Sequence, residues 1–94
     1  MSQSSRTGAI EGTVVSETGG PVEDARVLIT GASPSHHDIA ALTDARGRFR
    51  FDDLTPGHYG LRALSEADGQ AEYGMEVRAG NVARLELVLM RRPG

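Results

Sequence analysis

The sequence contains no cysteine, lysine or tryptophan among its 94 residues. The absence of cysteine excludes disulfides, thiolate metal sites and thiol nucleophiles. The absence of lysine excludes Schiff-base chemistry on a lysine amine, since all ten basic residues are arginine. The formal net charge of −3 lacks the basic excess that is typical of nucleic-acid binders. We therefore expect neither a thiol enzyme nor a nucleic-acid partner.

Long hydrophobic runs are also missing. The longest are Val27–Ile29 and Leu87–Met90, whereas a membrane-spanning helix needs about 20 apolar residues. Residues 1–8 contain no apolar region of the kind found in secretory signals. These features predict a cytoplasmic protein with no membrane partner. The length predicts one domain over residues 8–90, with a disordered N-terminal tail at 1–7 and a C-terminal tail at 91–94.

Glycine and proline interrupt the chain at short intervals, and apolar and polar residues alternate between them. Alternation with period two is typical of half-buried strands, and no stretch keeps a helical period for three turns. The pattern predicts strands over residues 9–16, 25–30, 38–43, 48–52, 58–64, 71–77 and 82–90. Seven short strands at this spacing predict an all-β, seven-stranded antiparallel sandwich of Greek-key type.

The alternation also predicts which side chains form the core. One face of each strand carries the larger apolar residues, and two such faces bury each other in a sandwich. The residues expected to face inward are Ile10, Gly12, Val14, Ala25, Val27, Ile29, Phe49, Phe51, Tyr59, Leu61, Ala63, Tyr73, Met75, Val77, Leu85, Leu87 and Leu89.

Two turns have recognisable chemistry. In Asp44-Ala45-Arg46-Gly47, the aspartate can accept backbone N–H groups ahead of it and the glycine suits a left-handed position. In Thr55-Pro56-Gly57, the proline presets its φ angle and the glycine permits a positive one.

Taken together, these segments resemble the carboxypeptidase regulatory-like domain family. The resemblance covers about residues 8–89 and is most specific in the block Thr43-Asp44-x-x-Gly47-x-Phe49-x-Phe51-x-x-Leu54-x-Pro56-Gly57-x-Tyr59-x-Leu61-x-Ala63. The residues that carry it, and to which we assign a structural role, are Gly12, Pro21, Asp44, Gly47, Phe49, Phe51, Leu54, Pro56, Gly57, Tyr59 and Leu61.

The resemblance implies a transthyretin-like (prealbumin-like) fold and a non-catalytic accessory role in binding or stability. We expect a free-standing domain, for which the resemblance names no obvious client. A remote alternative is a hydrolase of the 5-hydroxyisourate type, which shares the fold. That family's pattern includes a C-terminal Tyr-Arg-Gly-Ser, whereas this chain ends Met90-Arg91-Arg92-Pro93-Gly94.

A metal site is a further hypothesis. Alternate connections of an up-and-down chain lie at the same end, so the segments 31–37, 52–58 and 78–81 are expected to form one rim. That rim would carry histidines and carboxylates, which are the ligands of zinc, nickel or copper. The candidate ligands are His36, His37, Asp38, Asp53 and His58. Ordinary polar loop tips are the alternative, and we expect no cofactor.

The leading functional hypothesis is association with another protein or with a second copy of the chain. Several apolar residues fall on the outward parity of their strands and would form a patch if they share one sheet. They are Val15, Leu28, Leu42, Leu64, Val88 and Met90. Such a patch favours docking through an exposed sheet face or edge, with saccharide, small-molecule or metal binding at the rim of His36, His37 and His58 as the alternative.

Overall fold

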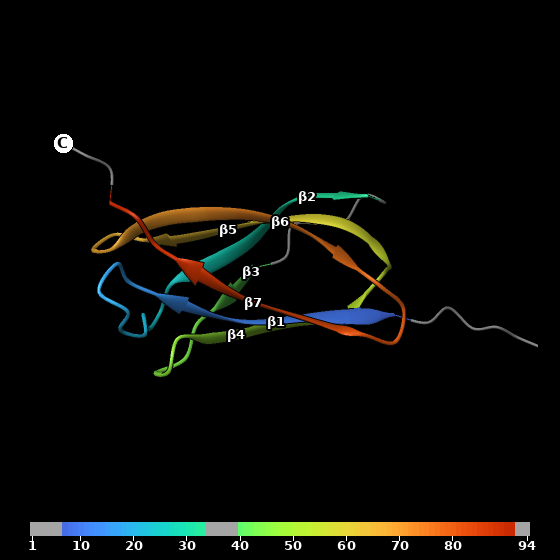
Figure 1. Ribbon diagram of the computed structural model, residues 1–94, viewed down its shortest axis with the longest axis horizontal. Helices are drawn as coiled ribbons and strands as arrows, with labels where there is room; N and C mark the ends of the chain where they lie inside the picture. The colour runs from blue at the N-terminus through green and yellow to red at the C-terminus, as the bar shows by residue number, and fades with distance from the viewer. Residues whose placement is uncertain (1–6, 34–39, 92–94) are drawn as a thin grey trace, which may run out of the picture.

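The computed structural model describes residues 7–33 and 40–91, and the side chains of 31–33 lie outside that description. All regular elements in these ranges are strands, as Figure 1 shows. They are β1 (Gly8–Val15), β2 (Arg26–Ser33), β3 (Ala40–Leu42), β4 (Arg48–Leu54), β5 (Gly57–Ser65), β6 (Gly69–Val77) and β7 (Val82–Val88). The seven-stranded all-β prediction is confirmed.

The strands form two sheets that face each other. One has the order β4-β1-β7 and the other the order β3-β2-β5-β6. In Figure 1 the two sheets are the lower and upper layers, and β6 and β7 are the strands nearest the viewer. The strands β6 and β7 therefore border one side of the sandwich, and β3 and β4 border the other.

One strand pair departs from the antiparallel expectation, because β1 and β7 run parallel. The connection from β6 to β7 explains this. It brings the chain beside the start of β1, where Ala9 N–H donates to Asn81 O at 3.0 Å and Gly80 N–H donates to Thr7 O at 2.9 Å. Because β7 begins where β1 begins, the two strands run in the same direction. The other pairs are antiparallel.

The core lies between the two sheets and contains the predicted inner faces of β1, β2, β4 and β5. Phe49 and Phe51 meet edge to face, with ring centroids 5.9 Å apart. Gly12 lies opposite Phe49 in register, and a Cβ atom at Gly12 would come within 2.7 Å of Phe49 Cζ. Burial of these side chains stabilises the fold at roughly 25 cal/mol per Å² of apolar surface.

The turn between β3 and β4 is held by Asp44. Its Oδ1 atom accepts the backbone N–H groups of Arg46 and Arg48, both at 2.9 Å. These two hydrogen bonds, first that of Arg48, lower the pKa of the Asp44 carboxyl. Gly47 has a φ of 76°, and a Cβ atom there would lie 2.5 Å from Val14 O. The turn thus requires an acceptor at its first position and glycine at its last.

A second corner joins β4 to β5. Leu54 is fully buried, and Tyr59 is buried with its hydroxyl donating to Thr55 O. Burial raises the pKa of Tyr59 because it disfavours the phenolate. Leu54 and Tyr59 thus fix this corner from the two strands that flank Pro56.

Thr43 is a buried polar residue that the alternation pattern does not identify. Its Oγ1 atom accepts Ala25 N–H at 2.8 Å and donates to Val22 O at 2.6 Å. Thr43 N–H also donates to Ala25 O at 3.0 Å. Thr43 therefore ties the end of β3 to the segment that leads into β2.

Candidate functional site

The proposed metal rim can be examined only in part. His36, His37 and Asp38 lie outside the described residues. His58 is exposed on β5 and pairs in register with Glu76, while Asp53 lies in the irregular part of the β1–β4 pair with a φ of 57°. Within residues 7–33 and 40–91, no three histidine, cysteine or acidic side chains gather as metal ligands do. The left-handed conformation, which aspartate tolerates better than most residues, gives Asp53 a local backbone role.

The outer face of the three-stranded sheet is charged. Glu11 on β1 lies between Arg50 on β4 and Arg84 on β7, at 3.5 Å and 3.1 Å. Arg50 also pairs with Asp52 at 2.7 Å. Exposed ion pairs of this kind contribute about 0–1 kcal/mol each and keep the face solvated. The middle of this face is therefore charged, while Val82 and Val88, which share the parity of Arg84 on β7, add apolar surface toward its ends.

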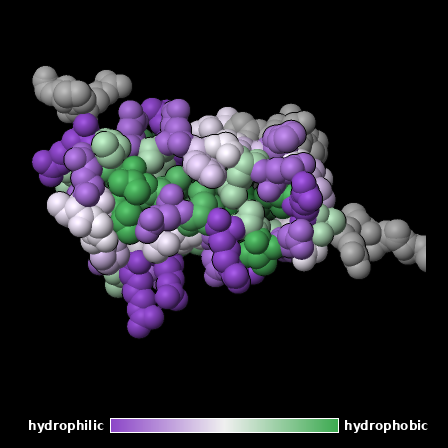
Figure 2. Space-filling view, viewed as in Figure 1, coloured by the Kyte–Doolittle hydropathy of each residue, from purple (hydrophilic) through white to green (hydrophobic). Residues whose placement is uncertain are grey.

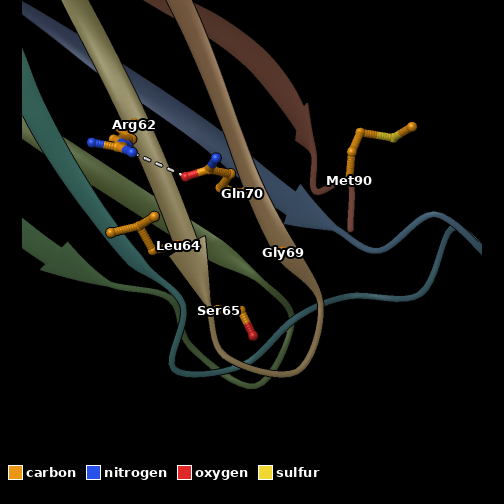
Figure 3. Close-up of a pocket in the computed structure, with 6 residues that line it drawn as sticks. All are labelled: Arg62, Leu64, Ser65, Gly69, Gln70 and Met90. Carbon is orange, nitrogen blue, oxygen red and sulfur yellow. Dashed lines mark hydrogen bonds between the residues drawn. The ribbon is translucent and has the colours of Figure 1, made fainter. Parts of the chain in front are cut away.

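The outer face of the four-stranded sheet is more mixed. A shallow depression of about 370 Å³ is lined by Arg62, Leu64, Ser65, Gly69, Gln70 and Met90 (Figure 3). Arg62 Nη2 donates to Gln70 Oε1 at 3.1 Å, and Arg62 Nε lies 3.6 Å from Glu72 Oε2. That separation is too long for a hydrogen bond, so the buried Nε has no hydrogen-bond partner among the described atoms. Met90 extends away from Leu64 in Figure 3, so the depression is open rather than enclosed.

Exposed apolar side chains concentrate on one side of the molecule. Of the described residues, five large apolar ones are exposed: Leu42 (63%), Tyr73 (50%), Val82 (40%), Val88 (41%) and Met90 (56%). All but Leu42 lie on β6, on β7 or just after β7. Figure 2 shows hydrophobic surface along this side, interrupted by charged side chains. We call these four residues, with the half-buried Met75 and Leu85, the β6/β7 edge.

The sequence predicts that Tyr73 is part of the core. This is wrong, because half of the residue is exposed. Tyr73 has the same parity as the buried Val77. However, β6 is the fourth strand of its sheet and the facing sheet has only three. The outermost strand of the wider sheet therefore has an inner face that the narrower sheet covers incompletely.

The main chain of β6 is open along most of its outer side. Gln70 N–H donates to Met90 O at 3.2 Å, and Met90 N–H donates to Gln70 O at 3.0 Å. Gln70 therefore directs its main-chain groups away from β5. Because these directions alternate along a strand, Glu72, Gly74 and Glu76 direct theirs the same way. In the part of the chain that the structure describes, this bridge to Met90, just after β7, is isolated and does not continue along β6.

The segment after β7 connects the two sheets at the end of the β6/β7 edge that carries the Gln70–Met90 bridge. Arg91 N–H donates to Glu17 Oε2 at 2.8 Å, and Arg91 Nε donates to Ala67 O at 3.0 Å. Together with the Gln70–Met90 bridge, these contacts join the two sheets at one end. From there no further bridge forms along β6 among the described residues, and Tyr73 and Met75 on β6 stay at least partly accessible.

Sequence reasoning found part of this edge. Val88 and Met90 belong to the predicted outward apolar set and lie on it, whereas Leu42 is exposed on the opposite border. The other three members of that set, Val15, Leu28 and Leu64, are half-buried. Val15 lies beside Val88 in the β1–β7 register, and Leu64 lines the depression together with Met90. Tyr73 and Val82 were missed. The exposure of Tyr73 follows from the unequal widths of the two sheets. The pattern of apolar and polar residues along a strand carries no information on how many strands each sheet has.

The described strands form an all-β sandwich with an open, partly apolar edge. The family model of the carboxypeptidase regulatory-like domain matches residues 9–90, and the chain belongs to this family. The family is regulatory-like and non-catalytic in character. A comparison with curated proteins finds no match. No helix long and apolar enough to cross a membrane occurs among the residues that the structure describes.

Solved structures show the same fold at low sequence identity. Chlorocatechol 1,2-dioxygenase from Pseudomonas putida aligns with 92% of this chain at 14% identity and a TM-score of 0.67. 3-Chlorocatechol 1,2-dioxygenase from Rhodococcus opacus aligns with 96% at 13% identity and a TM-score of 0.68. The alignments span only 61% and 62% of those two enzymes.

A third structure is similar in size as well as in fold. It is a Pseudomonas aeruginosa protein provisionally described as carbohydrate-binding, which aligns over 92% of this chain and 90% of its own length. The identity is 16% and the TM-score 0.66. At such identities, the three likenesses establish the sandwich fold and leave function to the residues of this chain.

Proposed function

We propose that this domain is a non-catalytic module that binds another protein chain through the β6/β7 edge. The observation that carries the proposal is that, of the five exposed large apolar residues in the described part of the chain, four lie on these two bordering strands or just after β7. Contiguous apolar surface on a small soluble domain marks an interaction site. An unpaired strand beside it supplies main-chain donors and acceptors, so a partner can add a strand and bury side chains at once.

The proposal is tested by placing a photo-crosslinking amino acid, benzoylphenylalanine, at position 73 in cells that express the protein. The matched control carries the same amino acid at Leu42, which is at least as exposed but lies on the opposite border. We expect several-fold more protein cross-links from position 73 than from position 42, with the products identified by mass spectrometry. Equal yields, or none from position 73, would refute the β6/β7 edge as the interface.

A second candidate function is saccharide binding, which the likeness to the Pseudomonas aeruginosa protein favours. Phe49, Phe51 and Tyr59 are buried, which leaves Tyr73 as the exposed aromatic ring for a sugar to contact. This function predicts a change in tyrosine fluorescence on titration with a glycan panel, lost in Tyr73→Ser. An unchanged signal across the panel would remove this candidate.

A further inference from the structure

We infer that the partner at the β6/β7 edge is a second copy of this chain, joined by antiparallel pairing of β6 with β6 to give one continuous eight-stranded sheet. This inference rests on the proposed function and specifies its partner. It follows from three properties of β6: an unobstructed main chain, a charge pattern that complements itself in one register, and sufficient length.

The strand β6 lacks most of the features that protect an edge from pairing. It is nine residues long, contains no proline, and pairs with β5 without a bulge. Gly74 lies at the middle of its open side, and a Cβ atom built there would meet nothing within 4 Å. The main-chain groups of Glu72, Gly74 and Glu76 are therefore accessible to an incoming strand. Only the two glutamates act against pairing, so their positions decide the register.

A two-fold axis through Gly74 is unfavourable. It would place Glu72 directly opposite Glu76 of the second copy, twice, and like charges opposite each other destabilise a strand pair. An axis through Tyr73 would place Gln70 opposite Glu76 of the second copy. The main-chain N–H and C=O groups of Gln70 are already hydrogen-bonded to Met90, so this pair could not form its hydrogen bonds.

An axis through Met75 is limited in a similar way at its ends, because Arg78 O already accepts Asn81 N–H at 3.1 Å, but it is the register that places opposite charges together. Glu72 then lies opposite Arg78 of the second copy, and Arg78 lies opposite the second Glu72, so two attractive pairs form. Gly74 lies opposite Glu76 of the second copy, and these two residues can exchange main-chain hydrogen bonds. On the other face, Met75 meets its own copy, with a Tyr73 ring on each side.

The side chains of Glu72 and Arg78 can exchange their ion-pair partners within the monomer for partners in the second copy. Glu72 lies 3.6 Å from Arg62 Nε, and Arg78 lies 3.6 Å from Glu76. The side chains of Glu72 and Arg78 are 71% and 74% exposed. Solvated pairs of this length contribute little and can be exchanged for contacts across the dimer.

The area available is that of a weak but specific dimer. In this register residues 72–78 of the two copies face each other over about 23 Å, and the edge of a two-layer sandwich is about 20 Å high, so each copy would bury roughly 460 Å². The total of roughly 900 Å² lies in the range of weak, transient protein interfaces. The pairing is therefore expected to depend on protein concentration.

Charge reversal tests the register directly by native mass spectrometry over a concentration series. The wild type is expected to form dimers. Glu72→Arg places arginine opposite Arg78, and Arg78→Glu places glutamate opposite Glu72, so each variant alone should weaken the dimer by about tenfold. An equimolar mixture of the two variants restores both attractive pairs in a heterodimer, which its mass distinguishes from either homodimer. Glu66→Arg, the same charge change in an exposed turn, is the control and should dimerise like the wild type.

The outcomes separate this inference from the proposed function. A wild type that remains monomeric throughout the series, or a dimer that neither single reversal weakens, overturns the β6–β6 pairing. If position 73 then cross-links to a different protein, the proposed function stands with another partner. A heterodimer that forms preferentially from the two variants supports the pairing, because Glu72 and Arg78 are too far apart along one strand to interact within a monomer.

Discussion

Thr43 is a polar residue whose environment makes it part of the core. It is 2% exposed, and its hydroxyl satisfies one main-chain donor and one main-chain acceptor. Buried polar groups are costly only when their partners are lost. A threonine at a strand end usually signals a solvated position, so the alternation of apolar and polar residues does not distinguish Thr43 from the exposed Thr30 or Thr55.

Replacing Thr43 by valine is expected to lower the free energy of unfolding by about 1–3 kcal/mol, because it leaves the buried Ala25 N–H without an acceptor. Thr43→Ser keeps the hydroxyl and should cost clearly less. Urea denaturation of the two variants measures the difference. A valine variant as stable as the serine variant would show that the hydroxyl does not matter.

At the scale of the element, the turn at Asp44 couples stability to pH. Its carboxylate accepts two main-chain N–H groups, so its pKa is lowered in the folded state. A lowered pKa contributes stability that is fully present above the unfolded pKa of about 4 and is lost as the pH falls through the folded pKa.

Asp44→Asn is therefore expected to be less stable than the wild type at pH 7 and to approach it as the pH falls below about 4. Asparagine keeps an acceptor oxygen, so the turn still forms. Thermal denaturation from pH 7 to pH 2 follows this convergence. Melting curves that stay equally far apart down to pH 2 would rule out ionisation of Asp44 as the cause.

The strands show what the sequence can and cannot determine. Alternation predicts all seven strands and the buried faces around Phe49, Phe51 and Leu61, because those strands face a partner sheet along their length. It fails at Tyr73, since a period-two pattern records parity but not whether another strand lies opposite. The parallel pairing of β1 with β7 is missed for a related reason, because it depends on where the connection at 78–81 places the chain.

At the scale of the whole molecule, the unequal sheets determine the candidate site. A four-stranded sheet packed on a three-stranded one has a border strand whose inner face is incompletely covered, and here that strand is β6. Neither Tyr73 nor Val88 is an unusual residue for a strand. What favours association is that both lie on the β6/β7 edge, where the main chain of β6 is unpaired because the topology makes β6 a border strand. The proposed rim of His36, His37 and His58 depends on a loop outside the described residues, so it stays a prediction.

The open edge of β6 predicts how fast each of its backbone amides exchanges hydrogen with solvent. In the free protein, the N–H groups of Tyr73 and Met75 bond to β5, whereas those of Glu72, Gly74 and Glu76 point away from it. Amide hydrogen exchange measured by NMR, first in dilute and then in concentrated protein, tests this most directly. We predict alternating slow and fast exchange along β6 in dilute solution. In concentrated solution, the fast amides should gain protection. Uniform protection in the dilute protein, or association that leaves these three amides unprotected, would contradict the β6/β7 edge as the binding surface.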